Sequence, residues 1–522
     1  MARASVLGLS MSAALWAQAA VAAPVEMTIH RQEVVRAIPP GAVGWGAMWK
    51  QDILYPAPGE LITDADHRAY IDRLGREGLR LARAADLRNI SWPWGVTFST
   101  WGVNWENSTG PWSERPVDCA RIVLLNKGSG WCEKTVVGVG DLMALAKRWR
   151  LEALTVAVPL AVLDGTRVRW GPNFITHEID GPTIEKISDH GAALIDFMRS
   201  RPEWADLQRI YLEAGCEWRH YGQPRAVASY AALIRRIREK IPDEKVIVVA
   251  SASDSADLDP VKANDWNRAL FEQLHAIPGI AADLHRYRGM VGLTAGPGGA
   301  TELTPENILR LAGTGRTQRG YFTVRPGQWN AGDDHPGMAS VSLENAIHGL
   351  VGDHSTHTEA PRPWAAVMAH ADLVREGLAS QAMTFLGWTW FPEDLPAEWP
   401  HGAILPNGTL ARHAEAQAFL SRYHRGSLLA SELSDETAVR GNAVLGPKGG
   451  VFLYGGNFSL DRQELQLTGA PTGNATVDLM GETEVETLEW DGRSPLGLPP
   501  MTLWRIAWPV RRLQVLALPG KS

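Results

Sequence analysis

Three consecutive stretches decide the fold: Arg209-Ile-Tyr-Leu-Glu213, the segment Val227–Ile241, and Lys245-Val-Ile-Val-Val-Ala-Ser-Ala252. The first and third are short runs with an apolar centre, and the third is rich in β-branched residues, which is typical of strands buried on both faces. In the segment between them, apolar residues recur on one helical face: Val227, Tyr230, Ile234, Ile237 and Ile241. A strand, a helix and a strand in this order predict two parallel strands joined by a crossover helix.

The same alternation continues through most of the chain. A second helical face is formed by Ile184, Ile187, Gly191, Leu194 and Met198. The predicted strands are Gly44–Trp49, Leu79–Ala84, Ala153–Leu160, Arg209–Glu213, Lys245–Ala252, Ile280–His285, Gly320–Val324 and Met383–Trp390. Eight strands alternating with helices over about 370 residues predict a (β/α)8 barrel of the α/β class. A doubly wound open sheet is the alternative, but no glycine-rich phosphate loop follows any of these strands.

The two ends of the chain differ from this pattern. After about residue 423, short alternating runs appear between turn signals, which predicts a β-sandwich over residues 424–522. The segment Val25–Ile29 also alternates and could add a strand to that sandwich. Residues 1–22 resemble a signal peptide, with Arg3, an apolar stretch and Ala20-Val21-Ala22 as cleavage site. We therefore expect a barrel over 23–423 and a secreted or periplasmic protein.

Composition excludes several classes of function. The 522 residues carry a formal net charge of −7 without basic runs, which argues against nucleic-acid binding. No apolar run beyond the N-terminus reaches the ~18 residues of a membrane span. Three cysteines are too few for a structural zinc ribbon, and Asp333-Asp-His335 has no second cluster at ligand spacing, so we expect no metal or cofactor. In an oxidising compartment, a Cys119–Cys132 disulfide is a hypothesis.

Tryptophan is unusually frequent, with 22 residues against 9 Tyr and 10 Phe. Core packing is one explanation, and stacking on sugar rings in a cleft is the other.

Chemically useful residues follow the predicted strands, where barrel enzymes place their active sites. Glu213, Glu217 and Trp218 end the fourth strand, and Asp283, His285 and Tyr287 end the sixth. The other strand exits supply Arg83 and Trp92 (second), Gln328 and Trp329 (seventh), and Trp388 and Trp390 (eighth). Carboxylates cleave glycosidic bonds and indoles stack on sugars, so this set predicts a carbohydrate substrate.

Arginines near predicted strand ends favour an acidic or sulfated sugar: Arg80, Arg83 and Arg325. The alternative is that they hold structural carboxylates. Each residue of the site has a similar structural alternative, such as a surface ion pair for Glu217 or core packing for the tryptophans.

The segment Glu213-Ala-Gly-Cys-Glu217 resembles the E-x-G-N-E signature at strand four of clan A glycoside hydrolases. Asp283–Tyr287 resembles their strand-six segment, and Gly387–Trp390 their strand-eight aromatic segment. The layout is similar to the xylosidase, arabinofuranosidase and agarase-like branches. The resemblance implies that Glu217 is the general acid/base and that His285 and Tyr287 line the subsite at the cleaved bond.

Two residues depart from the clan pattern. Cys216 stands where an Asn is usual, and Gln328 aligns with the nucleophilic Glu at the end of strand seven. An amide cannot form a glycosyl ester, so a retaining mechanism would lack its nucleophile. Four explanations stay open: an introduced Glu→Gln change, a nucleophile supplied by the substrate, an inactive sugar binder, or an inverting enzyme whose base is Asp283, Asp333, Asp334 or Glu393.

Two other functional classes also remain. A polysaccharide lyase would use Tyr287 or His285 as base, with Arg83 or Arg325 neutralising a uronate. A non-catalytic carbohydrate-binding protein would use the same aromatic residues and release no product.

Overall fold

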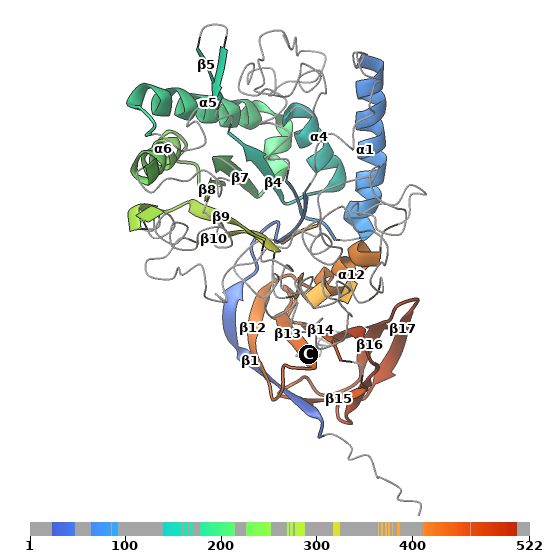
Figure 1. Cartoon of the computed structure of the whole chain (residues 1–522). Coiled ribbons are helices and arrows are strands. Elements are labelled where there is room, and N and C mark those ends of the chain that lie inside the picture. The colour runs from blue at the N-terminus through green and yellow to red at the C-terminus, as the bar shows by residue number, and fades with distance from the viewer. Residues whose placement is uncertain are drawn as a thin grey trace, which may run out of the picture.

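The computed structural model (Figure 1) describes two bodies that pack together, a barrel and a β-sheet domain. The described residues are 23–46, 64–84, 86–91, 139–158, 161–164, 167–170, 178–214, 226–251, 269–270, 272–274, 277–287, 317–323, short pieces between 364 and 386, 410, 412–459 and 461–508.

The barrel is built on an eight-stranded sheet in the order β10-β9-β8-β7-β4-β3-β2-β11. Its strands are β2 (Val43–Gly46), β3 (Asn89–Ser91), β4 (Ala153–Ala157), β7 (Arg209–Ala214), β8 (Val246–Ser251), β9 (Ile280–Tyr287), β10 (Thr317–Thr323) and β11 (Thr384–Leu386). The strands from β11 to β9 are parallel. The edge strands β10 and β11 approach each other, so the sheet nearly closes and the predicted barrel class is confirmed.

One strand direction differs from the prediction. β10, the seventh strand, pairs antiparallel with β9, with Thr323 opposite Ala281 and Thr317 opposite Tyr287. A regular (β/α)8 barrel would have this strand parallel.

Helices cover the outside of the sheet: α1 (Asp64–Ala84), α4 (Val139–Trp149), α5 (Gly181–Ser200) and α6 (Val227–Lys240), with a 3₁₀ turn, η6 (Pro202–Asp206). Alternate strand residues such as Leu154, Ile210 and Val248 pack with Ile187 and Ile234 of the helices in one buried core. Asp180 caps α5, because its Oδ1 accepts a 2.7 Å hydrogen bond from the Thr183 N–H.

The prediction of a strand at Leu79–Ala84 is wrong, because this segment forms the last turns of α1. The buried residues of this segment recur at the spacing of a helix face and do not alternate as in a strand: Gly75, Gly78, Leu81 and Ala82. Because the two glycines have no side chains, Trp149 of α4 packs directly against them. Its Nε1 donates a 3.1 Å hydrogen bond to the Gly75 carbonyl. The second barrel strand is instead β3.

Replacing Gly78 by alanine is expected to lower stability despite the better helix propensity of alanine. A Cβ there would overlap Cζ2 of Trp149, so the α1–α4 packing must open. The expected cost is about 1–3 kcal/mol, read as a lower midpoint of thermal unfolding. The control is Gly181→Ala, whose Cβ would meet nothing within 4 Å. Equal midpoints for the two variants would contradict this account of the packing.

The second body is one nine-stranded sheet in the order β17-β16-β19-β14-β13-β12-β1-β15-β18. Its strands are β1 (Val25–Ala37), β12 (Ser427–Leu433), β13 (Val439–Leu445), β14 (Val451–Asn457), β15 (Gln463–Thr468), β16 (Ala475–Met480), β17 (Val485–Trp490), β18 (Leu496–Leu498) and β19 (Thr502–Ala507). Residues from all nine strands meet in one core around Met27, Leu453 and Trp504, so the sheet folds over itself into two layers. β1 lies between β12 and β15, which places the N-terminal strand inside this domain.

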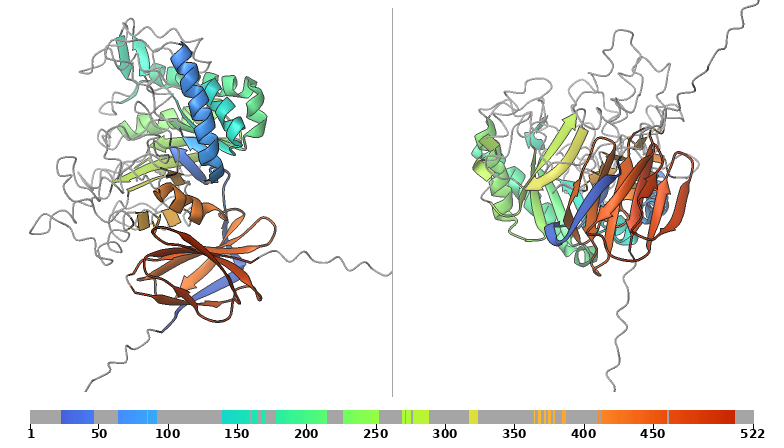
Figure 2. Two further views of the ribbon diagram at one scale, coloured as in Figure 1. Left: turned by 90° about the vertical axis from the view of Figure 1, so that its right-hand side faces the viewer. Right: turned by 90° about the horizontal axis from the view of Figure 1, so that it is seen from below.

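The sandwich packs against the barrel, with α12 (Arg412–Ser421) at the junction (Figures 1 and 2). Tyr454, Phe458 and Leu503 of the sandwich belong to the same buried cluster as the barrel core. The two bodies therefore share a continuous hydrophobic interior.

Candidate active site

Side chains on the inner face of the barrel strands are partly polar. Asn89, Thr155, Tyr211 and Glu213 are buried and alternate with the outward apolar residues of their strands. Asn89 Nδ2 donates to Thr155 Oγ1 at 3.2 Å. Such a polar interior is suited to supporting a polar site at one end of the barrel.

Tyr211 lies deep in this interior, in contact with the buried cluster of Ala153, Val249 and Ala281. Its hydroxyl donates to the Pro40 carbonyl at 3.4 Å. Burial raises the pKa of Tyr211 to about 12, so the phenol stays neutral and serves as a fixed hydrogen-bond donor.

Two hydrogen bonds, one from the chain after β4 and one from α6, fix the carboxyl end of β7. The Val158 N–H donates to the Glu213 carbonyl at 2.7 Å, and Tyr230 of α6 donates its hydroxyl to the Ala214 carbonyl at 2.6 Å. The Glu213 side chain is 0% exposed. Glu217 and Trp218 follow Ala214 by three and four residues and lie outside the described residues.

The strand-six residues lie in β9. β9 contains Asp283, His285 and Tyr287, and Ala281, two residues before Asp283, has its side chain in the barrel interior. Asp283 is level with Ser251, the last residue of β8, and therefore lies near the carboxyl ends of the strands. The predicted strand Ile280–His285 is therefore present and continues to Tyr287, and β8 lies between it and β7.

The alignment of Gln328 with a nucleophile requires a seventh strand parallel to the others, whereas β10 is antiparallel to β9. Because β10 is antiparallel, its last residue, Thr323, lies beside the start of β9, at the end of the barrel opposite to Tyr287. Gln328 and Trp329 follow this strand and lie outside the described residues, so their roles stay predictions.

Arg83 is not at a strand exit. It lies exposed in the last turn of α1, a helix that leads into the amino end of β3. The site was predicted at the opposite, carboxyl end of the barrel strands. The reason for assigning Arg83 to the substrate is therefore removed, and the cause is the misassigned strand at 79–84.

The predicted tryptophans lie outside the described residues, but two of the strands before them are described. β3 ends one residue before Trp92, and β11 ends two residues before Trp388 and four before Trp390. Both strands pair with β2, so they are near neighbours in the sheet.

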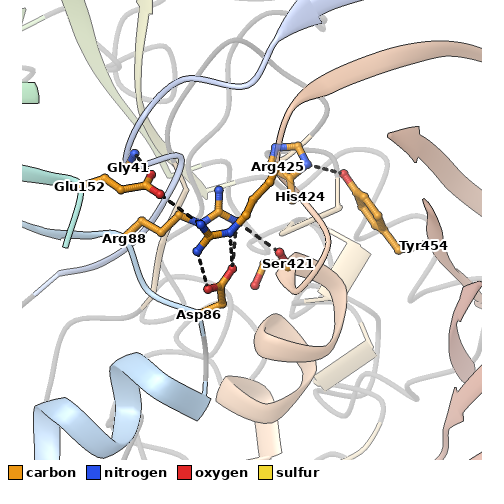
Figure 3. Close-up of polar contacts among 8 residues, drawn as sticks. All are labelled: Gly41, Asp86, Arg88, Glu152, Ser421, His424, Arg425 and Tyr454. Atoms are coloured by element: carbon orange, nitrogen blue, oxygen red, sulfur yellow. Dashed lines mark hydrogen bonds and ion pairs between the residues drawn. The ribbon is translucent and has the colours of Figure 1, made fainter. Parts of the chain in front are cut away.

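A polar network missed by the sequence analysis lies at the amino ends of the barrel strands (Figure 3). Asp86 binds Arg88 at 3.1 Å and Arg425 at 2.7 Å. Glu152 binds Arg425 at 3.3 Å and accepts from the Gly41 N–H at 3.0 Å. The network joins the amino ends of the barrel strands to the segment before β12, whereas the site is predicted at their carboxyl ends.

His424 completes this junction. Its ring is buried, and Nδ1 lies 3.0 Å from the Tyr454 hydroxyl. Burial, with the charges of Arg88 and Arg36, lowers the pKa of His424 well below its usual value. The ring is therefore neutral, and the cluster is structural rather than acid–base machinery.

Among the described residues, no group of three or more His, Cys, Asp or Glu side chains could hold a metal ion. The described part of the chain also contains no helix long and apolar enough to cross a membrane. The predicted signal peptide (residues 1–22), the three cysteines, Asp333, Asp334, His335 and Glu393 fall outside the described ranges.

No protein-family model matches this chain, and no curated protein is detectably similar in sequence. Solved structures do share its fold. An α-L-arabinofuranosidase from Thermotoga maritima superposes with a TM-score of 0.56 at 12% identity, covering 93% of this chain and 99% of that one. The GH51 arabinofuranosidase from Xanthomonas axonopodis pv. citri gives 0.55 at 14% identity, covering 93% and 99%.

The catalytic domain of GH30 xylanase C from Talaromyces cellulolyticus gives a TM-score of 0.52 at 12% identity, covering 92% of this chain and 99% of that one. At these identities the likeness concerns the fold. The chain shares the barrel-plus-sheet architecture of these glycoside hydrolases over nearly its whole length.

Proposed function

We propose that this protein hydrolyses O-glycosidic bonds in a poly- or oligosaccharide, with Glu217 as the general acid. The observation that carries the proposal is the position of β7. It is the fourth parallel strand of the barrel in chain order and ends at Ala214, three residues before Glu217. Barrel enzymes take their catalytic groups from such strand ends, and the structures that share this fold are named as glycoside hydrolases.

The second carboxylate in this proposal is Asp283. It lies in β9, level with the carboxyl end of β8. Glu217 gives its proton to the leaving oxygen as the anomeric C–O bond breaks. Asp283 takes a proton from the water that attacks the anomeric carbon from the other side. This is an inverting mechanism, which needs about 6.5–9.5 Å between the two carboxyl groups.

Aromatic residues after β3 and β11 would hold the polymer. Trp92, Trp388 and Trp390 follow strands that flank β2 on either side. Indole faces suit stacking on successive sugar rings. The export signal predicted in residues 1–22 would bring the enzyme to the periplasm or the medium, where such polymers are found.

The mechanism is tested by two substitutions. Asp283→Asn is expected to lower kcat by about 10²–10⁴-fold, the usual contribution of a general base, whereas Gln328→Glu leaves activity unchanged or lower. Proton NMR of the first product should show the inverted anomer. A gain of activity in Gln328→Glu together with retained configuration would contradict the inverting mechanism and restore strand seven as the source of the nucleophile.

A further inference from the structure

The exposed face of α1 carries a row of arginines. Its exposed polar residues recur every three to four positions, which is the spacing of one helix face: Arg68, Asp72, Arg76, Arg80 and Arg83. The opposite face is buried, with Gly78 packed against Trp149 of α4. Among the described side chains of α1, Asp72 is the only acidic one, so positive charge dominates the exposed face.

Arg148 of α4 extends this surface to the neighbouring helix. Its guanidinium group lies so close to Gly75 of α1 that a Cβ on this glycine would overlap Nη1. Gly75 directly precedes Arg76, and Arg148 is itself exposed. We call the surface formed by these five arginines the α1–α4 basic face: Arg68, Arg76, Arg80, Arg83 and Arg148.

Surface arginines on other helices of the barrel are neutralised by nearby acids. Arg199 of α5 lies 2.6 Å from Asp196, and Arg236 of α6 lies 2.6 Å from Glu185. Within the described part of the chain, no arginine of the α1–α4 basic face forms such an ion pair. The whole chain has a formal net charge of −7. An uncompensated positive surface on an acidic protein attracts a negatively charged partner.

The arginine row follows the outer wall of the barrel. Arg83 follows Arg68 by 15 residues, so at about 1.5 Å per residue the row is about 22 Å long. Figures 1 and 2 show α1 on the outside of the barrel. Because α1 connects the parallel strands β2 and β3, it runs back along the sheet, with Arg68 toward the carboxyl ends of the strands. A linear molecule bound along the row therefore extends toward the end where the active site is predicted.

We propose that the α1–α4 basic face is a secondary, non-catalytic surface that binds a linear polysaccharide carrying carboxylate or sulfate groups. The planar guanidinium group binds either oxyanion with two parallel hydrogen bonds. The choice of a polysaccharide rests on the proposed function, whereas the preference for an anion rests on the arginines alone.

The composition of the face favours a polysaccharide over a lipid surface or a protein. Helices that bind at a membrane interface insert apolar side chains, and protein interfaces are anchored by aromatic residues at their centre. The described exposed side chains of α1 are arginines, Asp72 and two alanines. The large hydrophobic side chains exposed in the described residues all lie in the sheet domain: Val34, Val35 and Val485. The face therefore offers charge and hydrogen bonds without an apolar anchor, which suits a hydrated, linear polyanion.

The test measures binding of the full chain to matched polymers by affinity electrophoresis and calorimetry. The probes are polygalacturonate with its carboxyl-reduced form, and a sulfated red-algal galactan with its desulfated form. The variant carries Arg76→Gln, Arg80→Gln and Arg83→Gln. It is expected to bind one or both anionic polymers about tenfold more weakly than the unaltered chain does, and the neutral forms within about twofold. Added salt should weaken anionic binding of the unaltered chain more than that of the variant.

The matched control removes three exposed arginines of the sheet domain: Arg31→Gln, Arg462→Gln and Arg493→Gln. It changes the net charge by the same amount, so an effect of net charge alone would weaken binding by both variants equally. Normal binding by this control, together with weak binding by the α1 variant, supports the α1–α4 basic face as the site.

The inference is overturned if the two variants bind alike, if the α1 variant loses charged and neutral polymers equally, or if the unaltered chain binds neither anionic polymer. Binding to vesicles of anionic phospholipid without binding to either polymer also overturns it, in favour of a lipid surface. These readings need no turnover. A chain that binds through the α1 arginines but releases no reducing ends refutes the hydrolase alone. A chain that releases reducing ends while the α1 variant binds every polymer normally refutes the binding surface alone.

Discussion

Replacement of Glu217 by glutamine is expected to lower kcat on a natural polysaccharide by about 10²–10⁴-fold, with binding nearly unchanged. Glutamine keeps the size of the side chain but has no proton to give to the leaving oxygen. An aryl glycoside whose leaving group is already acidic needs little protonation, so its cleavage should fall far less. The measurement is the ratio of kcat for the two substrate types in the variant and in the unaltered chain.

The control for this experiment is Glu244→Gln, the same change at an exposed position before β8. It should leave both rates unchanged. Full activity of Glu217→Gln on the polymer would show that another group protonates the leaving oxygen.

The second large effect is on stability and concerns Asp372 at the junction of the two bodies. Its carboxylate is fully buried and lies 2.7 Å from Arg375, and it also binds Arg440 of β13. Asp372→Asn would leave two largely buried guanidinium groups without their anion. The expected loss is about 3–5 kcal/mol, measured by chemical denaturation. The control, Asp196→Asn, removes an exposed ion pair with Arg199 and should cost less than about 1 kcal/mol.

The pH dependence of the Asp372 effect has a definite sign. Burial alone would raise the pKa of Asp372, but the two arginines outweigh it and hold the pKa below its usual value. A lowered pKa contributes stability above the pKa of the unfolded chain, about 3.9, and this stability is lost as the pH falls further. The difference between the unaltered chain and Asp372→Asn should be constant near pH 7 and shrink below about pH 4. A difference that grows with acidity would contradict this ion-pair account.

The sequence predicts the barrel strands well where short, largely apolar runs alternate with helical patterns, as in β4, β7, β8 and β9. It fails at Leu79–Ala84, because Leu-Arg-Leu-Ala-Arg alternates like a strand while the buried side is set by Gly75, Gly78 and the bulky Trp149. The packing of α1 against α4 determines the conformation of this segment, and the local sequence pattern does not indicate that packing. The direction of β10 is likewise fixed by pairing with β9 rather than by its own residues.

The sequence indicates which residues of the candidate site follow the barrel strands. It does not give the distances between their side chains. The hairpin of β5 (Ala161–Asp164) and β6 (Arg167–Trp170) has a local signal, because Gly165-Thr166 separates two short runs of four residues. The network of Asp86, Glu152 and Arg425 had none, because Asp86 and Arg425 are 339 residues apart and only the docking of the sandwich brings them together. Long-range ion pairs of this kind follow from the assembled fold.

The central claim is that this chain is a hydrolase of glycosidic bonds, and the most direct measurement is product formation by the unaltered chain on a panel of bacterial, plant and algal polysaccharides. Reducing ends and ultraviolet absorbance should be followed together. We predict that reducing ends appear on at least one polymer without any rise in absorbance. Reducing ends with a parallel rise would identify the unsaturated products of a lyase, and binding without either signal would identify a non-catalytic carbohydrate-binding protein.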